Sequence, residues 1–328
     1  MEEFILENNA LMAVTEVTKT VGKFAWLYHW FSNPERTKKQ TDADIYAVER
    51  AIEVAEKHPG WNISYNDGKF NFSESTPEEL IMRARSRMLA ESIKKESNCE
   101  KVLMLATNEV QQSEKISEKP VDEDWLTRFF HIVEDINSEE IQIVWSKILA
   151  GEIMQPGRFS LRTIETIRNV SKDEAEMFQN IIPIVMKSVN NLFITNDESI
   201  LKKNGINYGM ILRLSECGLI NSNSLLSFEF KVTNHDAAQI FNNNTLIKIL
   251  GKESIIYNFS LGIYTLTKAG EELYSILNKT YSKEYIYDLA EKIYIDNKDN
   301  VIVSIHVTTT ILNDGRILYI ASPLRSFS

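Results

Sequence analysis

The chain has 328 residues, of which 43% are hydrophobic and 25% charged, a composition typical of a globular protein with two or three domains. The formal net charge of −10 opposes nonspecific binding to nucleic-acid backbones and anionic membranes, although a local basic patch remains compatible with it. The 12 glycines and 7 prolines are few for this length, which favours long helices over a loop-rich β fold.

The sequence carries no targeting or membrane signal, and it has too few cysteines for a disulfide framework. Cys99 and Cys217 lie far apart, and neither has a second cysteine at metal-ligand spacing. The N-terminus lacks the basic region of a signal peptide, and no stretch approaches the ~20 apolar residues of a membrane-spanning helix. We therefore expect a cytoplasmic protein without a transmembrane segment.

The first predicted element is an amphipathic helix over residues 11–31, and its end is rich in aromatic residues. Around Trp26 and Trp30, apolar side chains surround the helix instead of lining one side. Two interpretations are open. This helix end is either buried in a core or oligomer interface, or it anchors the protein to a partner or a membrane surface.

A second helix, a β-hairpin and a long helix are predicted next. The helix covers residues 42–57, and the hairpin is WNISYNDGKFNF with Asp67-Gly68 as its turn. Thr76-Pro77-Glu78-Glu79 supplies a capping box for the helix that follows. No Gly or Pro occurs from Glu78 to Lys119, which predicts one very long helix, or two with a soft break near Ser97-Asn98. Such a helix usually packs along several partners or along a copy of itself.

The middle and last thirds of the chain differ in pattern. Residues 121–190 predict a compact antiparallel helical unit, with Asp122, Ser138, Ser160 and Ser171 as N-caps. Further along, β-type runs alternate with short helices, in an order that resembles a winged helix–turn–helix followed by an α-β-β element.

We therefore predict a mainly α protein, with helical N-terminal and middle regions, a long helix, and a C-terminal α+β winged-helix-like region. The expected domains are N-terminal helices with a hairpin, a helical core, a winged-helix-like segment and an α-β-β element, over residues 1–75, 76–195, 196–280 and 281–328.

Residues 145–163, WSKILAGEIMQPGRFSLRT, resemble the central motif of an uncharacterised bacterial family, W-x-K-I-L-A-G-E-I-x-x-P-G-x-F-S-x-R-T. The resemblance continues upstream and downstream and covers roughly residues 85–280. It is carried there by Arg87, Glu91, Asn98, Glu100, Val102, the segment Pro120–Phe130, Leu266-Thr267 and Gly270. The family implies no reaction or cofactor, but bacterial proteins of this kind are found among mobile or phage-defence genes.

Residue types that perform catalysis do not form a motif in this chain. No two of the five histidines have the i, i+4 spacing of a helical zinc site, and there is no G-x-S-x-G, Walker or G-x-G-x-x-G sequence. Glu229-Phe230-Lys231 mimics half of a nuclease Glu-x-Lys pair, but no further carboxylate is placed convincingly to hold Mg²⁺. We predict no catalytic, cofactor-binding or metal-binding residues and no cofactor.

Polar residues of the central motif are the first candidate binding group. Lys147, Glu152, Arg158 and Arg162 flank a Pro-Gly turn. They form either a pocket for an acidic group, with Arg162 as a bidentate donor, or a structural network that fixes the connection between two helices.

A second candidate group lies in the winged-helix-like segment. Lys202 and Lys203 precede a possible recognition helix that contains Arg213. DNA-reading helices usually carry more positive charge, and many winged helices bind proteins instead.

Three functional hypotheses follow. The first is a non-enzymatic helical scaffold or interaction protein that binds a protein partner or self-associates through its long helix and its aromatic N-terminal helix. The second is a DNA-binding regulator that uses residues 205–280, although the net charge disfavours nucleic acid. The third is a phage-defence effector or sensor.

Overall fold

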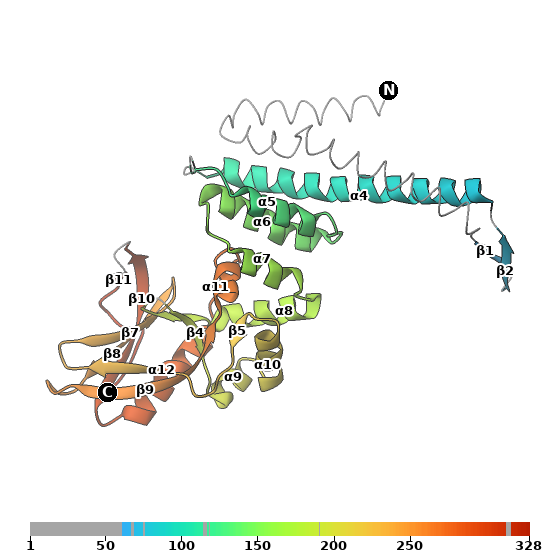
Figure 1. Ribbon diagram of the computed structural model, residues 1–328. Helices are drawn as coiled ribbons and strands as arrows, with labels where there is room; N and C mark the ends of the chain where they lie inside the picture. The colour runs from blue at the N-terminus through green and yellow to red at the C-terminus, as the bar shows by residue number, and fades with distance from the viewer. Residues whose placement is uncertain are drawn as a thin grey trace. The chain divides into compact units, whose positions relative to one another are not determined.

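The computed structural model describes residues 61–66, 69–74, 76–113, 117, 119–189, 191–312 and 316–328 (Figure 1). The chain divides into two compact units, with the boundary between Pro156 and Gly157. The predicted helices over residues 11–31 and 42–57, including Trp26 and Trp30, lie outside the described residues. Among the helices that are described, none is both long enough and apolar enough to cross a membrane.

In its described residues, the first unit is a hairpin followed by three helices. Its elements are β1 (Trp61–Asn66), β2 (Lys69–Glu74), α4 (Pro77–Gln111), α5 (Glu123–Val133) and α6 (Glu139–Met154). The predicted hairpin is confirmed, because β1 and β2 pair antiparallel from Trp61↔Glu74 to Asn66↔Lys69. The predicted capping box is confirmed as well. The Glu79 amide donates to Thr76 Oγ1 (3.2 Å), and the Thr76 amide donates to Glu79 Oε2 (3.3 Å).

Helix α4 is one uninterrupted helix of 35 residues. Its buried residues all belong to the second half, where α4 packs along α5 and α6; they are Asn98, Cys99, Val102, Ala106 and Val110. Beneath them, the Phe129 ring lies 5.0 Å from Trp125 and 5.5 Å from Trp145, centroid to centroid. Both tryptophans are buried.

The second unit combines short helices with many strands. Its helices are α7 (Leu161–Arg168), α8 (Lys172–Ile181), η1 (Ile182–Ile184), α9 (Glu198–Lys203), α10 (Tyr208–Glu216), α11 (Lys268–Tyr274) and α12 (Lys283–Asn297). Its strands are β3 (Met186–Ser188), β4 (Asn191–Thr195), β5 (Ile220–Asn221), β6 (Ser227–Val232), β7 (Ala237–Phe241), β8 (Thr245–Gly251), β9 (Tyr257–Leu266), β10 (Val301–Ile311), β11 (Ile317–Tyr319) and β12 (Arg325–Phe327).

The prediction of a mainly α protein with a winged-helix-like C-terminal region is wrong. Within the described residues, the second unit contains one ten-stranded sheet in the order β11-β10-β8-β7-β3-β4-β9-β5, with β12 on β10 and β6 on β9. In this sheet, β5 and β9 continue through β4 and β3 into β7, β8 and β10. Local patterns miss this arrangement because pairing between distant segments decides it.

Near the middle of the ten-stranded sheet, the junction between β3 and β7 has the fewest paired residues. In the described residues β3 pairs with β7 through a single register pair, Lys187↔Phe241. Helix α12 packs on β10, and its fully buried Tyr285 accepts the Thr195 amide at 2.8 Å. This hydrogen bond connects α12, which packs on β10, to β4 on the other side of the junction between β3 and β7.

Substitution of Gly270 tests how closely α11 packs against the segment before β5. A Cβ at Gly270 would overlap the Leu219 carbonyl oxygen, which already accepts the Thr267 amide at 3.0 Å. Gly270→Ala should therefore lower the free energy of unfolding by about 1–3 kcal/mol, although Ala is the better helix former.

The matched control is Gly209→Ala in α10, where a Cβ meets only the Asn207 side chain, at 3.1 Å. Urea unfolding of both variants measures the difference. Equal stability of the two would show that α11 is not held against Leu219.

Candidate functional site

The four motif residues fall on both sides of the boundary between the two units. Lys147 is half-buried on α6, and Glu152 is buried near the end of that helix. In the second unit, Arg158 Nη2 donates to Ser275 Oγ at 3.0 Å, whereas Arg162 is exposed on α7. Within the second unit, therefore, the two arginines have different surroundings.

The three cations of the predicted recognition segment do not point to a common ligand. Lys203 Nζ binds Asp288 Oδ1 of α12 at 2.7 Å, and this hydrogen bond, more than any other contact, raises the pKa of Lys203. Lys202 is exposed on α9, and Arg213 is exposed on α10. The carboxylate partner of Lys203 reduces the positive field that a phosphate backbone would meet there.

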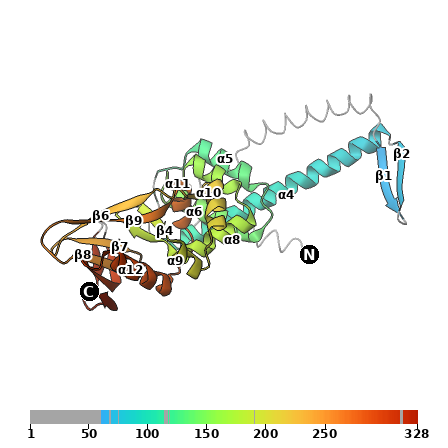
Figure 2. The ribbon, with the colours of Figure 1, turned by 90° about the horizontal axis from the view of Figure 1, so that it is seen from below.

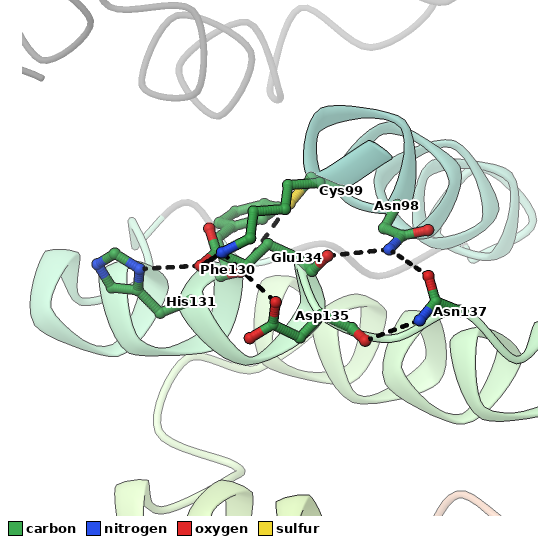
Figure 3. A network of polar contacts seen from close by, with 8 residues as sticks. Asn98, Cys99, Phe130, His131, Glu134, Asp135 and Asn137 are labelled. Atoms are coloured by element: carbon green, nitrogen blue, oxygen red, sulfur yellow. Dashed lines mark hydrogen bonds and ion pairs between the residues drawn. The ribbon is translucent and has the colours of Figure 1, made fainter. Parts of the chain in front are cut away.

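The best-defined polar cluster in the first unit was not among the binding groups predicted from the sequence (Figure 3). It joins α4, the end of α5 and the segment before α6. At its centre, Asn98 Nδ2 donates to the Glu134 carbonyl at 2.9 Å and to Asn137 Oδ1 at 3.4 Å. Gln142 Nε2 in turn donates to Asn98 Oδ1 at 3.1 Å and to the Ile136 carbonyl at 2.8 Å.

Burial makes these amide contacts costly to lose. Asn98 is 5% exposed and Gln142 is 2% exposed, so neither amide could exchange its partner for water. A break in the long helix near Asn98 was one of the two predictions from the sequence. The helix is continuous there, and the Asn98 side chain fixes the register of α4 on α5 and α6. A polar Asn on the same side of the helix as Val102, Ala106 and Val110 was the sequence signal for this contact.

The rim of the cluster is charged and more exposed. Lys95 Nζ lies 3.1 Å from Glu134 Oε1 and 3.4 Å from Asp135 Oδ1. Its hydrogen bond to Glu134 raises the pKa of Lys95. His131 Nδ1 lies 3.8 Å from the same Glu134 oxygen. Exposed ion pairs add little stability, about 0–1 kcal/mol, so the buried amides dominate the docking of α4.

Cys99 completes the cluster on its apolar side. Its thiol lies 3.9 Å from the Phe130 carbonyl, and burial, together with Glu96, Glu134 and Glu100, raises the pKa of Cys99 to about 12. A thiol of this kind is a poor nucleophile and a poor metal ligand. No group of three or more His, Cys, Asp or Glu is placed to hold a metal ion in the part of the chain that the structure describes. The cluster therefore positions a helix and does not resemble a reaction centre.

The opposite side of α4 carries an apolar row. Met82, Leu89, Ile93 and Met104 are 66%, 63%, 61% and 60% exposed. At 100° per residue they fall within roughly 60° of one another, whereas the docked residues from Asn98 to Val110 lie on another side of the helix. We call these four residues the outer stripe. Figure 2 shows that α4 extends beyond α5 and α6.

Asn98→Ala should lower the free energy of unfolding by about 1–3 kcal/mol, because it removes one partner each from Gln142 and the Glu134 carbonyl while both stay buried. Ser92→Ala, at an exposed position of the same helix, is the control and should change stability little. Chemical denaturation measures both variants. A neutral Asn98→Ala would mean that the amide cluster does not hold α4.

Cys99 should report release of α4. Raising a thiol pKa from 9.0 to about 12 lowers the thiolate population at neutral pH by roughly a thousandfold. In a Cys217→Ser background, labelling by a thiol reagent should therefore be slow, and Asn98→Ala should accelerate it. Labelling of the unaltered chain at the rate of a free thiol would contradict the docked position.

Comparison with known proteins agrees with the resemblance seen in the sequence. A family model described as Protein of unknown function (DUF2806) matches residues 82–290, well over half of the chain. No curated protein and no solved structure shows significant similarity to this chain. The match includes most of α4, with the amide cluster and the outer stripe, and continues to α12. The chain therefore belongs to the DUF2806 family of proteins of unknown function.

Proposed function

We propose that the protein is a non-enzymatic interaction protein in which α4 pairs with α4 of a second copy through the outer stripe. The observation that carries the proposal is the exposure of four large apolar side chains, in one row, on a helix whose other side is docked. Exposed apolar rows of this kind usually mark interaction surfaces. The amide cluster supports the proposal because it holds the helix in one orientation before any partner binds.

The order of charges along the outer stripe favours an antiparallel pair. Glu78, Arg85, Glu96 and Glu100 lie on the same side of α4 as the stripe, by helical spacing. In a parallel pair each of these residues would meet its own copy. In an antiparallel pair centred near Glu91, Leu89 lies level with Ile93 of the other helix, and Arg85 lies within one residue of Glu96.

Repulsion between Glu96 and Glu100 of one α4 also supports the antiparallel pair. Partial burial and the charge of Glu100, one turn away, raise the pKa of Glu96. An arginine supplied by a second α4 would oppose this repulsion, and the two-fold axis would form the pair twice. The apolar contacts supply most of the stabilisation, whereas the charges select the direction and register of the helices.

Size-exclusion chromatography with light scattering tests the proposal on the full chain. The expected mass is twice the chain mass of 37.8 kDa, and Leu89→Glu/Ile93→Glu should give the single-chain mass. Ile255→Glu/Ile256→Glu changes two exposed isoleucines in the loop before β9 and should leave the dimer intact.

A charge exchange tests the register. Arg85→Glu should weaken the dimer about twofold to tenfold, and Arg85→Glu/Glu96→Arg should restore it. A monomeric unaltered chain would contradict the proposal and direct attention to residues 11–31, with Trp26 and Trp30, as the cover of the stripe. Absorbance at the nucleic-acid wavelength in the same run tests the DNA-binding alternative. The predicted recognition segment does not favour that alternative, because Lys203 forms an ion pair with Asp288.

A further inference from the structure

Four cations of α4 lie along one side of the helix. They follow one another at spacings of four, seven and seven residues and are Arg83, Arg87, Lys94 and Lys101. At 100° per residue they fall within roughly 40° of one another, and at 1.5 Å per residue they extend over about 27 Å. All four residues are exposed. We call these four residues the cationic row.

Carboxylates are few beside the cationic row. Residues 80–105 carry six cations and three carboxylates, Glu91, Glu96 and Glu100. By helical spacing, Glu96 and Glu100 lie on the side of the outer stripe, and Glu91 is the one that lies beside the row. Among the described residues, no ion pair within 4.0 Å joins a carboxylate to any member of the row.

Neighbouring acids are engaged by other groups. Glu79, which precedes the row on the same helix, accepts the Thr76 amide at 3.3 Å in the capping box. At the end of α5, Glu134 and Asp135 lie 3.1 Å and 3.4 Å from Lys95 Nζ. Lys95 lies roughly 100° around α4 from the row. The cationic row therefore keeps a net positive charge.

The net charge of −10 on the whole chain does not remove this local positive field. Figure 2 shows that α4 extends beyond α5 and α6. Arg83 lies about 22 Å along the helix from Asn98, the first of the docked residues. Exposed charges further apart than about 8 Å are largely screened at physiological ionic strength. Among the described residues, an anion that approaches this half of α4 therefore meets chiefly the charges of the helix itself.

The row is suited to the backbone of double-stranded DNA. A DNA duplex carries one negative charge per about 1.7 Å of its axis, whereas the surface of a folded protein usually intersperses charges of both signs. A row of about 27 Å exceeds the width of the major groove, about 12 Å, so its cations can contact phosphates on both sides of that groove. Helix α4 contains no Phe, Tyr or Trp on which the bases of a single strand could stack. The row therefore favours a duplex that is contacted through its phosphates.

We infer that the cationic row binds the phosphate backbone of double-stranded DNA. Binding by the row of one chain does not depend on the pairing of α4, but the proposed antiparallel pair enlarges the surface. The row lies roughly 100° around α4 from the outer stripe. The two-fold axis of an antiparallel pair is perpendicular to both helices, so the two rows face the same side, whereas in a parallel pair they face opposite sides. This doubled surface rests on the proposed function.

Fluorescence anisotropy of a labelled DNA duplex of about 20 base pairs, two helical turns, tests the inference on the full chain. Saturable binding is expected at low salt. Lys94→Gln/Lys101→Gln should weaken it about tenfold or more and reduce the slope of log affinity against log salt concentration by about two for each bound chain. Lys94→Arg/Lys101→Arg should bind as the unaltered chain does. The matched control, Lys172→Gln/Lys252→Gln, removes two exposed lysines of the second unit and should change neither affinity nor slope.

Three results would overturn the inference. They are the absence of duplex binding at low salt, equal losses in the two lysine-to-glutamine pairs, and displacement of the duplex by polyglutamate at an equal concentration of negative charge. The last result would assign an acidic protein partner to the row.

Light scattering of the same samples separates the row from the pairing. Leu89→Gln/Ile93→Gln leaves the charge of α4 unchanged and should give the single-chain mass, with duplex binding retained at about half the salt slope. Duplex binding by an unaltered chain that is monomeric, if it is lost in Lys94→Gln/Lys101→Gln, would support the row and contradict only the pairing.

Discussion

The side-chain amide of Asn98 is the constraint on which the first unit depends. A buried amide must find partners, and Asn98 finds them in a backbone carbonyl after α5 and in Gln142 of α6. The apolar contacts of Cys99, Val102, Ala106 and Val110 have no preferred direction, whereas the hydrogen bonds between Asn98 and Gln142 hold at one register of the two helices. The orientation of the outer stripe is therefore set by hydrogen bonds on the other side of the same helix.

Local sequence signals predicted much of the first unit. Thr76, Pro77 and Glu79 marked the start of α4, and Asp122 marked the start of α5. Ser138 is the N-cap of α6, as predicted, although its hydroxyl donates to the Glu140 carboxylate and makes no cap hydrogen bond to the backbone. The second unit was less predictable. Strand β8 is buried at most positions, so it loses the alternation by which a strand is recognised, and β3 has only three residues.

The candidate sites show the same division between local and distant information. The exposed apolar positions of α4 could be read from helical spacing. The contact between Asn98 and Gln142 carried no signal, because the two residues lie 44 positions apart in the sequence. A polar cluster assembled from several segments is not visible in local patterns.

The single register pair between β3 and β7 has a mechanical consequence. Neighbouring strands in a sheet are rotated by about 20–25° on average, and strongly twisted open sheets rarely exceed about ten strands without curling or splitting. At the junction between β3 and β7, side-chain contacts supplement the backbone pairing of the two strands. Ser188 Oγ donates to the Gln239 carbonyl at 3.2 Å, and Asn242 Nδ2 lies 3.5 Å from Met186 Sδ. Side-chain contacts tolerate a change of angle between two strands better than a continuous set of backbone hydrogen bonds does. The strands from β11 to β7 and those from β3 to β5 can therefore each keep their own twist, with the change of twist at the junction between β3 and β7.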